Sequence, residues 1–514
     1  MTTGLYNAAD WLVDRHVRDG RGDRVAVRCQ GESHTYADVQ RSVRRVQHAL
    51  HDLGVGAGDR VVLLMNDTPE LVAWFVGCLR SGVIAVPVST MLLAADIAAI
   101  AADADATALV VSEQYAAHCP TVAAAAGRPR ATVVIDEGGT RLDGARAWSE
   151  FSADGEIAAA PTTEDSPAFW LYSSGTTGTP KGVMHVHRNL QATYETYAEQ
   201  VLAIGPDDRC LSVAKLFFAF GLGNSLTFPF GAGATAILEP GRPTPSGMAA
   251  LVDAERPTLF FASPGFTAAL LDAGLDPDVF GTVRATVTAG EALPADLQRR
   301  FSQRFGHPVV DGIGSTEVLH IFISNRLEAQ RPGTSGWVVP GYEAVLLDEQ
   351  GEEVIEADTP GYLHVRGPST ATGYWQRPDA SALAFRSDGW VRTGDVYTRS
   401  ADGCWTFLGR NNDMIKAGGI WVSPAEVEAA LVAHPDVLEA AVVGARSAEG
   451  LEQTVSFVVA RAGHEIDPEA LIAHCRQHMA AYKRPARVIP IDELPKTATG
   501  KIQRFKLRER LGDD

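Results

Sequence analysis

The chain lacks the features that mark several broad classes of protein. Its 514 residues include only six cysteines, which are scattered without a C-x-x-C pair, so the sequence predicts neither a zinc site nor a disulfide framework. A reducing, cytoplasmic location fits this cysteine usage. No apolar run approaches the roughly 20 residues that a membrane span needs. Residues 1–10 lack the basic-then-apolar layout of a signal peptide, so we expect no leader.

Positive charge is also scarce. The sequence has 45 Lys and Arg residues against 63 Asp and Glu residues, which gives a formal net charge of −18 at pH 7. This excess disfavours binding to nucleic acids and to anionic membranes. We therefore expect small-molecule partners and neither a nucleic acid nor a membrane.

The length and the apolar pattern predict an α/β protein of more than one domain. A single core stops growing near roughly 250–300 residues, which is well below this length. Short, continuous Val/Ile/Leu runs predict strands buried on both faces of largely parallel, doubly wound sheets. These runs cover residues 60–66, 83–89, 108–112, 132–136, 259–262, 285–289 and 309–313.

After residues 410–413 the pattern changes to a compact α+β arrangement. Ser423, Pro424 and Glu426 predict a helix start with a complete capping box. The predicted domains are therefore residues 1–411 and residues 412–514.

The most informative segment is residues 172–182, which read Tyr-Ser-Ser-Gly-Thr-Thr-Gly-Thr-Pro-Lys-Gly. Glycines let backbone N–H groups approach a polyphosphate, hydroxyls add donors, and a lysine neutralises charge. The segment predicts a nucleotide-binding loop, with a flexible linker as the alternative. It is no Walker-type loop, because Pro180 precedes Lys181 and no Ser or Thr follows. The residues predicted to bind phosphate are Ser173, Ser174, Gly175, Thr176, Thr177, Gly178 and Lys181.

Four downstream stretches give this loop a family context. They are Asp-Gly-Ile-Gly-Ser-Thr-Glu at 311–317, Arg-Thr-Gly-Asp at 392–395, Gly-Arg-Asn-Asn-Asp-Met-Ile-Lys at 409–416 and Pro-Lys-Thr-Ala-Thr-Gly-Lys at 495–501. In this order, over essentially the whole chain, they resemble the adenylate-forming enzymes: acyl- and aryl-CoA ligases, luciferase and peptide-synthetase adenylation domains. The resemblance implies a large N-terminal domain of α/β sheets with a small β-barrel-like part, and a small mobile C-terminal α+β domain.

The resemblance also implies cofactors and residue roles. ATP, Mg²⁺ and coenzyme A are the expected cofactors, with Glu317 as the magnesium ligand beside Thr316. Asp395 corresponds to the residue that binds the ribose hydroxyls, and Arg410 to the arginine near the ribose and phosphate. Lys501 corresponds to the lysine that reaches the reacting carboxylate and the α-phosphate. The other residues placed at the nucleotide are Ala289, Gly290, Glu291, Asp311 and Gly312.

Each of these roles has a plainer alternative. Glu317 could be a surface glutamate, Asp395 a turn residue and Lys501 an exposed lysine. The order of the motifs favours the functional interpretation in each case.

The family carries out two half-reactions, and the small domain is thought to rotate between them. A carboxylate and ATP first give an acyl-adenylate and pyrophosphate, and a thiol then displaces AMP. Asn412 lies at the hinge position, where the family usually has Asp or Lys. Lys416, Gly418 and Gly419 correspond to the segment that faces the active site in the second conformation.

Residues 215–224 and 315–325 resemble benzoate–CoA ligases in particular. The implied acid pocket consists of Phe218, Ala219, Phe220, Gly314, His320 and Ile321, although plain core packing is the alternative for the aromatic residues. Phe220 stands where these ligases usually have tyrosine. Ala219 stands where amino-acid-activating domains have aspartate, which argues against an α-amino acid because its ammonium would be buried unpaired.

Three functions therefore compete. The first is an aryl-CoA ligase, an AMP-forming acid–thiol ligase for benzoate or a substituted benzoate. The second is a stand-alone aryl-acid adenylating enzyme that loads a carrier protein. The third is a catalytically silent nucleotide-binding or scaffold protein, against which intact Glu317, Asp395 and Lys501 argue. A homodimer is one assembly that the resemblance allows.

Overall fold

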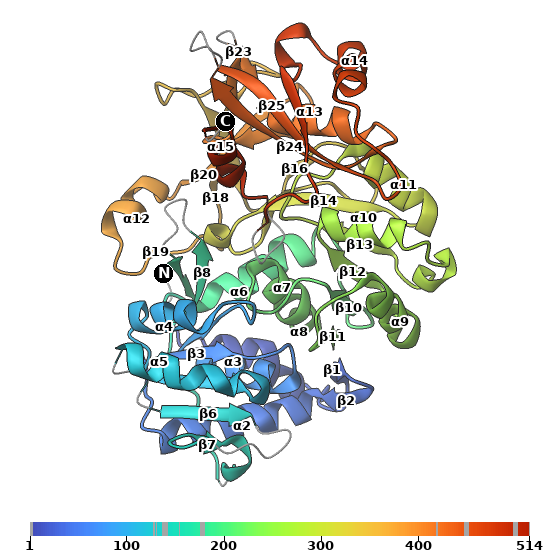
Figure 1. The fold of residues 1–514 in the computed structure, drawn as a ribbon. Helices are drawn as coiled ribbons and strands as arrows, with labels where there is room; N and C mark the ends of the chain where they lie inside the picture. The colour runs from blue at the N-terminus through green and yellow to red at the C-terminus, as the bar shows by residue number, and fades with distance from the viewer. Residues whose placement is uncertain are drawn as a thin grey trace.

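The computed structural model describes residues 4–126, 129, 131–135, 142–153, 155–174, 180–417, 420–446, 452–496 and 502–512. It contains two large sheets, a four-stranded sheet and a C-terminal group of strands and helices (Figure 1). The C-terminal elements lie together at the top of the view in Figure 1, and the N-terminal helices lie at the opposite end.

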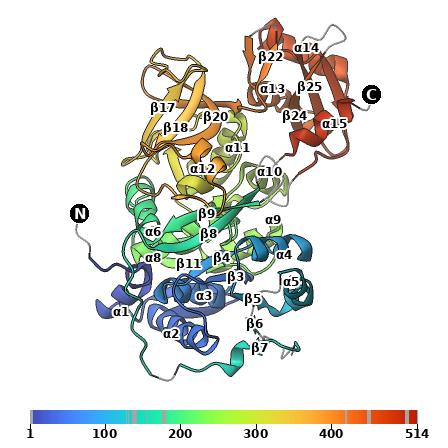
Figure 2. The ribbon, with the colours of Figure 1, turned by 90° about the vertical axis from the view of Figure 1, so that its left-hand side faces the viewer.

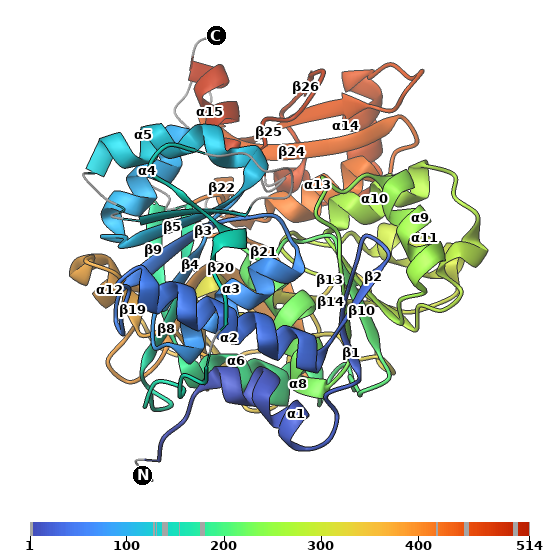
Figure 3. The ribbon, with the colours of Figure 1, turned by 90° about the horizontal axis from the view of Figure 1, so that it is seen from below.

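The first large sheet has eight strands in the order β19-β9-β8-β4-β3-β5-β6-β7. Its central strands are parallel and their side chains are buried, because helices cover both faces. Figure 3 shows α2 (Tyr36–Asp52) and α3 (Pro69–Arg80) on one side, and α4 (Ala94–Asp103) and α5 (Cys119–Ala126) on the other. The strands are β3 (Arg60–Leu64), β4 (Ile84–Pro87), β5 (Ala108–Ser112), β6 (Ala131–Ile135), β7 (Arg146–Ala147), β8 (Pro167–Ser174), β9 (Pro180–Val186) and β19 (Gly373–Tyr374).

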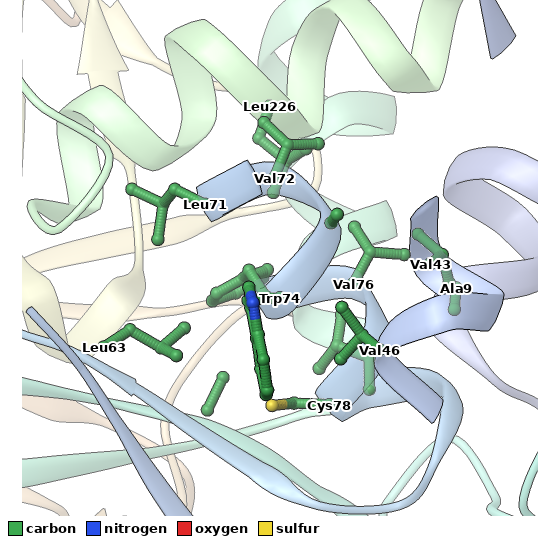
Figure 4. Close-up of a cluster of buried hydrophobic side chains, with 14 of the residues drawn as sticks. Ala9, Val43, Val46, Leu63, Leu71, Val72, Trp74, Val76, Cys78 and Leu226 are labelled. Carbon is green, nitrogen blue, oxygen red and sulfur yellow. The ribbon is translucent and has the colours of Figure 1, made fainter. Parts of the chain in front are cut away.

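Helix α3 is the centre of the core on one face of this sheet. Its Trp74 is fully buried among side chains of α2, the sheet and α3 itself (Figure 4). The two helices approach so closely that a Cβ at Gly77 would lie 2.5 Å from Cγ1 of Val46, so only glycine fits there. This packing fixes α3, and its amino end lies at the carboxyl ends of the parallel strands.

The second large sheet has nine strands in the order β16-β15-β14-β13-β12-β10-β11-β1-β2. Helices α9 (Pro245–Glu255), α10 (Pro264–Asp272) and α11 (Ala295–Phe305) pack on one face around Phe260 and Phe280. The strands are β1 (Val25–Cys29), β2 (Glu32–Thr35), β10 (Arg209–Ser212), β11 (Thr235–Leu238), β12 (Leu259–Ala262), β13 (Ala285–Thr288), β14 (Val309–Gly314), β15 (Ile321–Ser324) and β16 (Trp337–Val338).

A four-stranded antiparallel sheet packs against the other face of the nine-stranded sheet through Leu363 and Trp405. It consists of β17 (Glu343–Leu347), β18 (Gly361–Arg366), β20 (Val391–Arg399) and β21 (Trp405–Arg410). Figure 2 shows it beside the C-terminal elements. It corresponds to the small β-barrel-like part that the sequence predicts.

The C-terminal elements have a core of their own, which includes Val427, Leu431 and Leu471. They are β22 (Ile415–Ala417), β23 (Ile420–Val422), α13 (Pro424–Val432), β24 (Val437–Arg446), β25 (Glu452–Ala460), α14 (Pro468–His478), β26 (Arg487–Pro490) and α15 (Arg504–Gly512).

The start of α13 corrects one detail of the prediction. Ser423 caps the helix by accepting a hydrogen bond from the Glu426 N–H, as predicted. The Glu426 carboxylate instead accepts from the Lys483 ammonium at 2.7 Å, so the predicted return bond of a capping box is wrong. A full positive charge competes better for the carboxylate than a backbone N–H does.

The predicted fold class is confirmed: the structure is α/β with a separate C-terminal α+β part. The boundary at residues 411 and 412 and the mobility of the C-terminal part stay predictions. Across the described ranges, no helix is long and apolar enough to cross a membrane.

Candidate active site

The predicted phosphate loop joins two antiparallel strands. β8 and β9 pair in register, with Ser173 opposite Lys181, and the described chain leaves β8 at Ser174 and resumes at Pro180. The apolar residues of β8 are buried in the eight-stranded sheet. The hairpin therefore fixes both ends of the loop.

A turn after β14 carries Thr316 and Glu317 to this hairpin. The Nε2–H of His185, in β9, donates to the Thr316 carbonyl at 2.9 Å. Burial lowers the pKa of His185 to about 4, so the ring is neutral. The neutral ring has one proton, and the shorter contact, to the Thr316 carbonyl, favours Nε2, while Nδ1 lies 3.2 Å from Oδ1 of Asn189. His185 thus ties the Thr316–Glu317 turn directly to the phosphate-loop hairpin.

Tyr374 holds the Glu317 side chain from a third segment. Its hydroxyl donates to Oε1 of Glu317 at 2.9 Å, and its strand β19 pairs with β9. The Lys181 ammonium lies 5.2 Å from the centroid of the Tyr374 ring, within range of a cation–π contact. Tyr374 therefore contacts the Glu317 carboxylate through its hydroxyl and the Lys181 ammonium through its ring, next to the ends of the phosphate loop.

Asp395 and Arg410 face each other across the pair β20–β21. The Arg410 Nε lies 3.1 Å from Asp395 Oδ1, and Arg410 Nη1 donates to the Thr393 carbonyl at 3.0 Å. The Asp395 side chain is 5% exposed whereas that of Arg410 is 51% exposed, so the carboxylate is held inside and the guanidinium extends outward.

Asp311 lies within β14, next to the segment 289–291, which follows the neighbouring parallel strand β13. Burial raises the pKa of Asp311 to about 8, although the Thr288 hydroxyl donates to its Oδ1 at 2.7 Å. Ala289 is buried, and Gly290 has a φ of +97°, which only glycine adopts without strain. A backbone turn therefore leaves the sheet beside a carboxyl group that stays largely protonated at neutral pH.

The predicted acid-pocket residues come from two segments that meet. Phe218, Ala219 and Phe220 are half-buried at the start of the short helix α7 (Ala219–Leu222). The rings of Phe220 and His320 lie 5.5 Å apart, centroid to centroid. At Gly314 a Cβ would lie 2.5 Å from the His320 carbonyl oxygen, so a larger residue would displace that loop. Ile321 is buried in β15, in the core beneath the pocket.

His320 has a defined protonation state. Burial lowers its pKa to about 3, so the ring is neutral. Nε2 lies 3.2 Å from Asn224 Oδ1, which can only accept, and the Asn224 amide is itself oriented by a bond to Ser212. The Asn224 contact favours a proton on Nε2; Nδ1 has no partner in hydrogen-bond geometry among the described residues, although the nearby Phe220 backbone carbonyl raises the pKa of the ring.

The structure thus brings together Ser173, Lys181, Thr316, Glu317 and the acid pocket at the carboxyl ends of the two sheets. Asn412 is exposed in the turn between β21 and β22, and Lys416 pairs with Trp421 along β22 and β23. Of the predicted residues, those outside the described ones are Gly175, Thr176, Thr177, Gly178, Gly418, Gly419 and Lys501.

Three residues to which the sequence motifs assign no role also support the site. They are His185, Tyr374 and Asn224. Two of them have a weak signal in the sequence. Tyr374 stands in the aromatic run Gly-Tyr-Trp at 373–375, and His185 lies four residues after Lys181, which places both on the same face of a strand. Nothing in the sequence pairs Asn224 with His320, which lies 96 residues away.

These features are typical of the adenylate-forming class of enzyme. They are the glycine-rich loop between β8 and β9, the turn with Glu317, the buried Asp395 on the four-stranded sheet and the separate C-terminal α+β part. Family models agree: the AMP-binding enzyme model matches residues 13–375, and the AMP-binding enzyme C-terminal domain model matches residues 426–501. The chain belongs to the AMP-binding enzyme family.

Among characterised relatives, a benzoate–CoA ligase of Thauera aromatica is 42% identical over 510 residues, covering 98% of this chain and 96% of the relative. A benzoate CoA ligase structure from Burkholderia xenovorans LB400 has a TM-score of 0.89 at 39% identity, covering 98% and 100% of the two chains. The anthranilate CoA ligase AuaEII, solved with anthranoyl-AMP, has a TM-score of 0.92 at 37% identity, covering 99% and 98%. The predicted resemblance to adenylate-forming enzymes, nearest to benzoate–CoA ligases, is confirmed.

Proposed function

We propose that this protein activates an aromatic carboxylic acid with ATP and transfers the resulting aroyl group to the thiol of coenzyme A, releasing pyrophosphate and then AMP. The predicted acid–thiol ligase activity is confirmed at the level of the family by full-length relatives that are benzoate–CoA ligases. The observation that carries the proposal is the meeting of the phosphate-loop hairpin, the Glu317 turn and the half-buried aromatic pocket at one edge of the two sheets.

The site residues divide the chemistry between them. Lys181 and the loop hydroxyls hold the β- and γ-phosphates that leave as pyrophosphate, which orients the leaving group in line with the attacking carboxylate. Asp395 accepts hydrogen bonds from the ribose hydroxyls, and Arg410 lies beside it. Lys501 stabilises negative charge on the reacting carboxylate and α-phosphate in the first half-reaction.

The donor set around Glu317 fits magnesium that arrives with the nucleotide. Mg²⁺ is usually held by one or two carboxylates together with substrate phosphates and water. Glu317 supplies one oriented carboxylate, and the described residues contain no cluster of three or more ligands that would form a resident cage. When bound, the ion would neutralise phosphate charge.

The protonation of His320 indicates which substituents the aromatic acid carries on its ring. Its Nε2–H is used by Asn224, so the ring cannot donate to the substrate carboxylate through that atom. Its free Nδ1 can only accept, and a buried acceptor without a partner is costly. An aromatic acid whose ring bears an amino or hydroxyl donor would satisfy it. The related anthranilate CoA ligase, solved with anthranoyl-AMP, handles an acid of this kind.

The proposal is tested by ATP–pyrophosphate exchange with a panel of acids: benzoate, its amino-, hydroxy- and halo-derivatives, and medium-chain aliphatic acids. We expect exchange with the aromatic acids, and the highest kcat/KM for an amino- or hydroxybenzoate. A preference for the aliphatic acids would contradict the pocket assignment.

Loading of a carrier protein in place of coenzyme A is the second candidate, and it has less support because the relatives reported above are CoA ligases. The proposal also includes a cytoplasmic location, which is supported by six buried cysteines that form no disulfide in the described structure. A homodimer and rotation about Asn412 remain part of the proposal as well.

A further inference from the structure

Asp67 is a buried carboxylate outside the motifs that define the site. It lies between the end of β3 and the start of α3, at the edge of the eight-stranded sheet, and is 3% exposed. Both of its oxygens lie 3.2 Å from the backbone N–H of Leu216, which belongs to the loop that follows β10 in the nine-stranded sheet. The Asp67 side chain therefore joins the two sheets at the carboxyl ends of their strands β3 and β10.

The loop that Asp67 contacts, residues 213–218, leads directly into Phe218, Ala219 and Phe220. The other hydrogen bonds that hold this loop come from the loop itself and from the nine-stranded sheet. The Val213 N–H donates to the Phe261 carbonyl at 2.8 Å, and the Lys215 ammonium donates to the Gly241 carbonyl at 2.8 Å. The Phe218 N–H donates to the Lys215 carbonyl at 3.0 Å and closes the turn before α7.

The charges around Asp67 agree with a role in fixing this loop. Burial raises the pKa of Asp67 to about 6, while Lys215 and the Leu216 N–H lower it and Glu239 raises it. The group is therefore largely ionised at neutral pH, when its bond to the N–H is charge-assisted and stronger than a neutral one.

Apolar contacts also place the loop against α3, the helix that begins just after Asp67. Leu71 and Val72 of α3 border a small apolar cavity together with Leu216 and Leu222. Figure 4 shows Leu226 beside Val72. These contacts can slide, because they have no direction, whereas the two-oxygen contact from Asp67 fixes the position of the Leu216 backbone.

We propose that Asp67 is a positioning residue for the aryl-acid pocket: from the eight-stranded sheet it holds the loop before Phe218, Ala219 and Phe220 in place against His320, which lies on the same nine-stranded sheet as that loop. This inference rests on the function proposed above and assigns the control of acid binding to a residue that does not touch the acid. The nucleotide side of the site is held by separate contacts, those of His185 and Tyr374, and does not depend on it.

The test compares Asp67→Asn, which keeps the size of the side chain but removes its charge, with Asp208→Asn. Asp208 precedes β10 at its opposite end and is also poorly exposed, paired with Arg284 at 2.9 Å. Both variants lose a buried charge in the same part of the fold, so the control measures general damage. The readout is the KM for the best aromatic acid and the KM for ATP in pyrophosphate exchange, with thermal unfolding recorded for each variant.

In Asp67→Asn one oxygen can still accept from the Leu216 N–H, but the charge and the second oxygen are lost, so we expect the acid KM to rise by about ten-fold with the ATP KM within about two-fold of wild type. Asp208→Asn should lower the melting temperature and leave the ratio of the two KM values unchanged. An unchanged ratio in Asp67→Asn, or an equal shift in both variants, would overturn the inference. If Asp67→Asn does not fold, the same ratio measured on Asp67→Ser decides. Failure of the wild type to exchange with any aromatic acid would overturn the proposed function instead.

Discussion

The hydroxyl of Tyr374 donates a hydrogen bond to Oε1 of Glu317 at 2.9 Å, and the two residues lie 57 positions apart in the sequence. The bond crosses from β19 to the turn after β14, so it joins the eight-stranded sheet to the nine-stranded one. The carboxylate that we assign to the nucleotide is thus oriented by a residue on the phosphate-loop side of the site.

Replacement of this tyrosine should weaken catalysis without loss of the fold. In Tyr374→Phe, the ring remains beside Lys181 but the hydroxyl is lost, so Glu317 is free to turn away. We expect the pyrophosphate exchange rate to fall by about ten-fold, in line with the loss of a hydrogen bond to a charged group. Tyr362→Phe, on the four-stranded sheet, serves as a matched control and should keep the wild-type rate. An unchanged rate in Tyr374→Phe would show that Glu317 needs no such support.

The Asp395–Arg410 pair predicts a selective defect in nucleotide binding. Asp395→Asn leaves one oxygen to accept from a ribose hydroxyl but removes the charge that faces Arg410 at 3.1 Å. We expect the KM for ATP to rise by about ten-fold or more, with the KM for the acid little changed. Steady-state kinetics with each substrate varied in turn measure this. A larger change for the acid than for ATP would contradict the assignment to the ribose.

His320 predicts a change in selectivity. In His320→Leu the buried Nδ1 acceptor is gone, so an amino- or hydroxybenzoate should lose its advantage over benzoate. We expect the ratio of their kcat/KM values to fall by about ten-fold, while the total activity falls for all acids because Asn224 loses its donor. Phe220→Leu is the control: it changes the apolar wall and should affect both acids alike. An unchanged ratio in His320→Leu would exclude Nδ1 as the acceptor.

Lys501 should act in the first half-reaction only. We expect Lys501→Ala to abolish adenylate formation, because the developing negative charge loses its ammonium, and to leave thioester formation from supplied aryl-adenylate largely intact. The two half-reactions are measured separately, by pyrophosphate exchange and by consumption of the adenylate with coenzyme A. Equal loss of both would contradict the two-conformation account.

Buried histidines predict that the protein loses stability on mild acidification. Burial lowers the pKa of His16, His185, His187 and His307 to about 4 and that of His320 to about 3. In the unfolded chain they would bind protons below pH about 6.5, so stability falls as the pH drops from about 6.5 toward 4.

Two buried carboxyl groups, Asp67 and Asp311, act in the opposite direction because their pKa values are raised to about 6 and about 8. The stability lost through the five histidines exceeds that gained through the two carboxyl groups, so we expect the melting temperature at pH 5.5 to lie below that at pH 7.5. A higher melting temperature at pH 5.5 would show that these histidines are already protonated in the folded state.

Local rules were enough to predict much of the fold. The strands at residues 108–112 and 259–262 have the bounds that their apolar runs indicate, because both faces of these strands are buried. At Glu426 the local rule failed, since Lys483, 57 residues away, takes the carboxylate that a capping box would use. A contact of that kind depends on the packed fold and leaves no mark on a short segment.

The candidate site also contains residues that short motifs predict and residues that only the folded structure identifies. The phosphate loop, Glu317 and Asp395 were found from motifs, because each has a characteristic neighbourhood in the sequence. His185, Tyr374 and Asn224 support those residues from other strands, and Asp67 reaches Leu216 from a position 149 residues earlier. The motifs assign no role to any of these residues, so their supporting role follows from their contacts in the folded chain.

The most direct test of the central claim is the formation of thioester and AMP from ATP, Mg²⁺, coenzyme A and an aromatic acid by the purified protein, without any carrier protein. We predict stoichiometric aryl-CoA, AMP and pyrophosphate, with an amino- or hydroxybenzoate used better than benzoate and far better than an aliphatic acid. Pyrophosphate release from ATP in the presence of these acids, without coenzyme A-dependent AMP release, would contradict the ligase account and favour carrier loading.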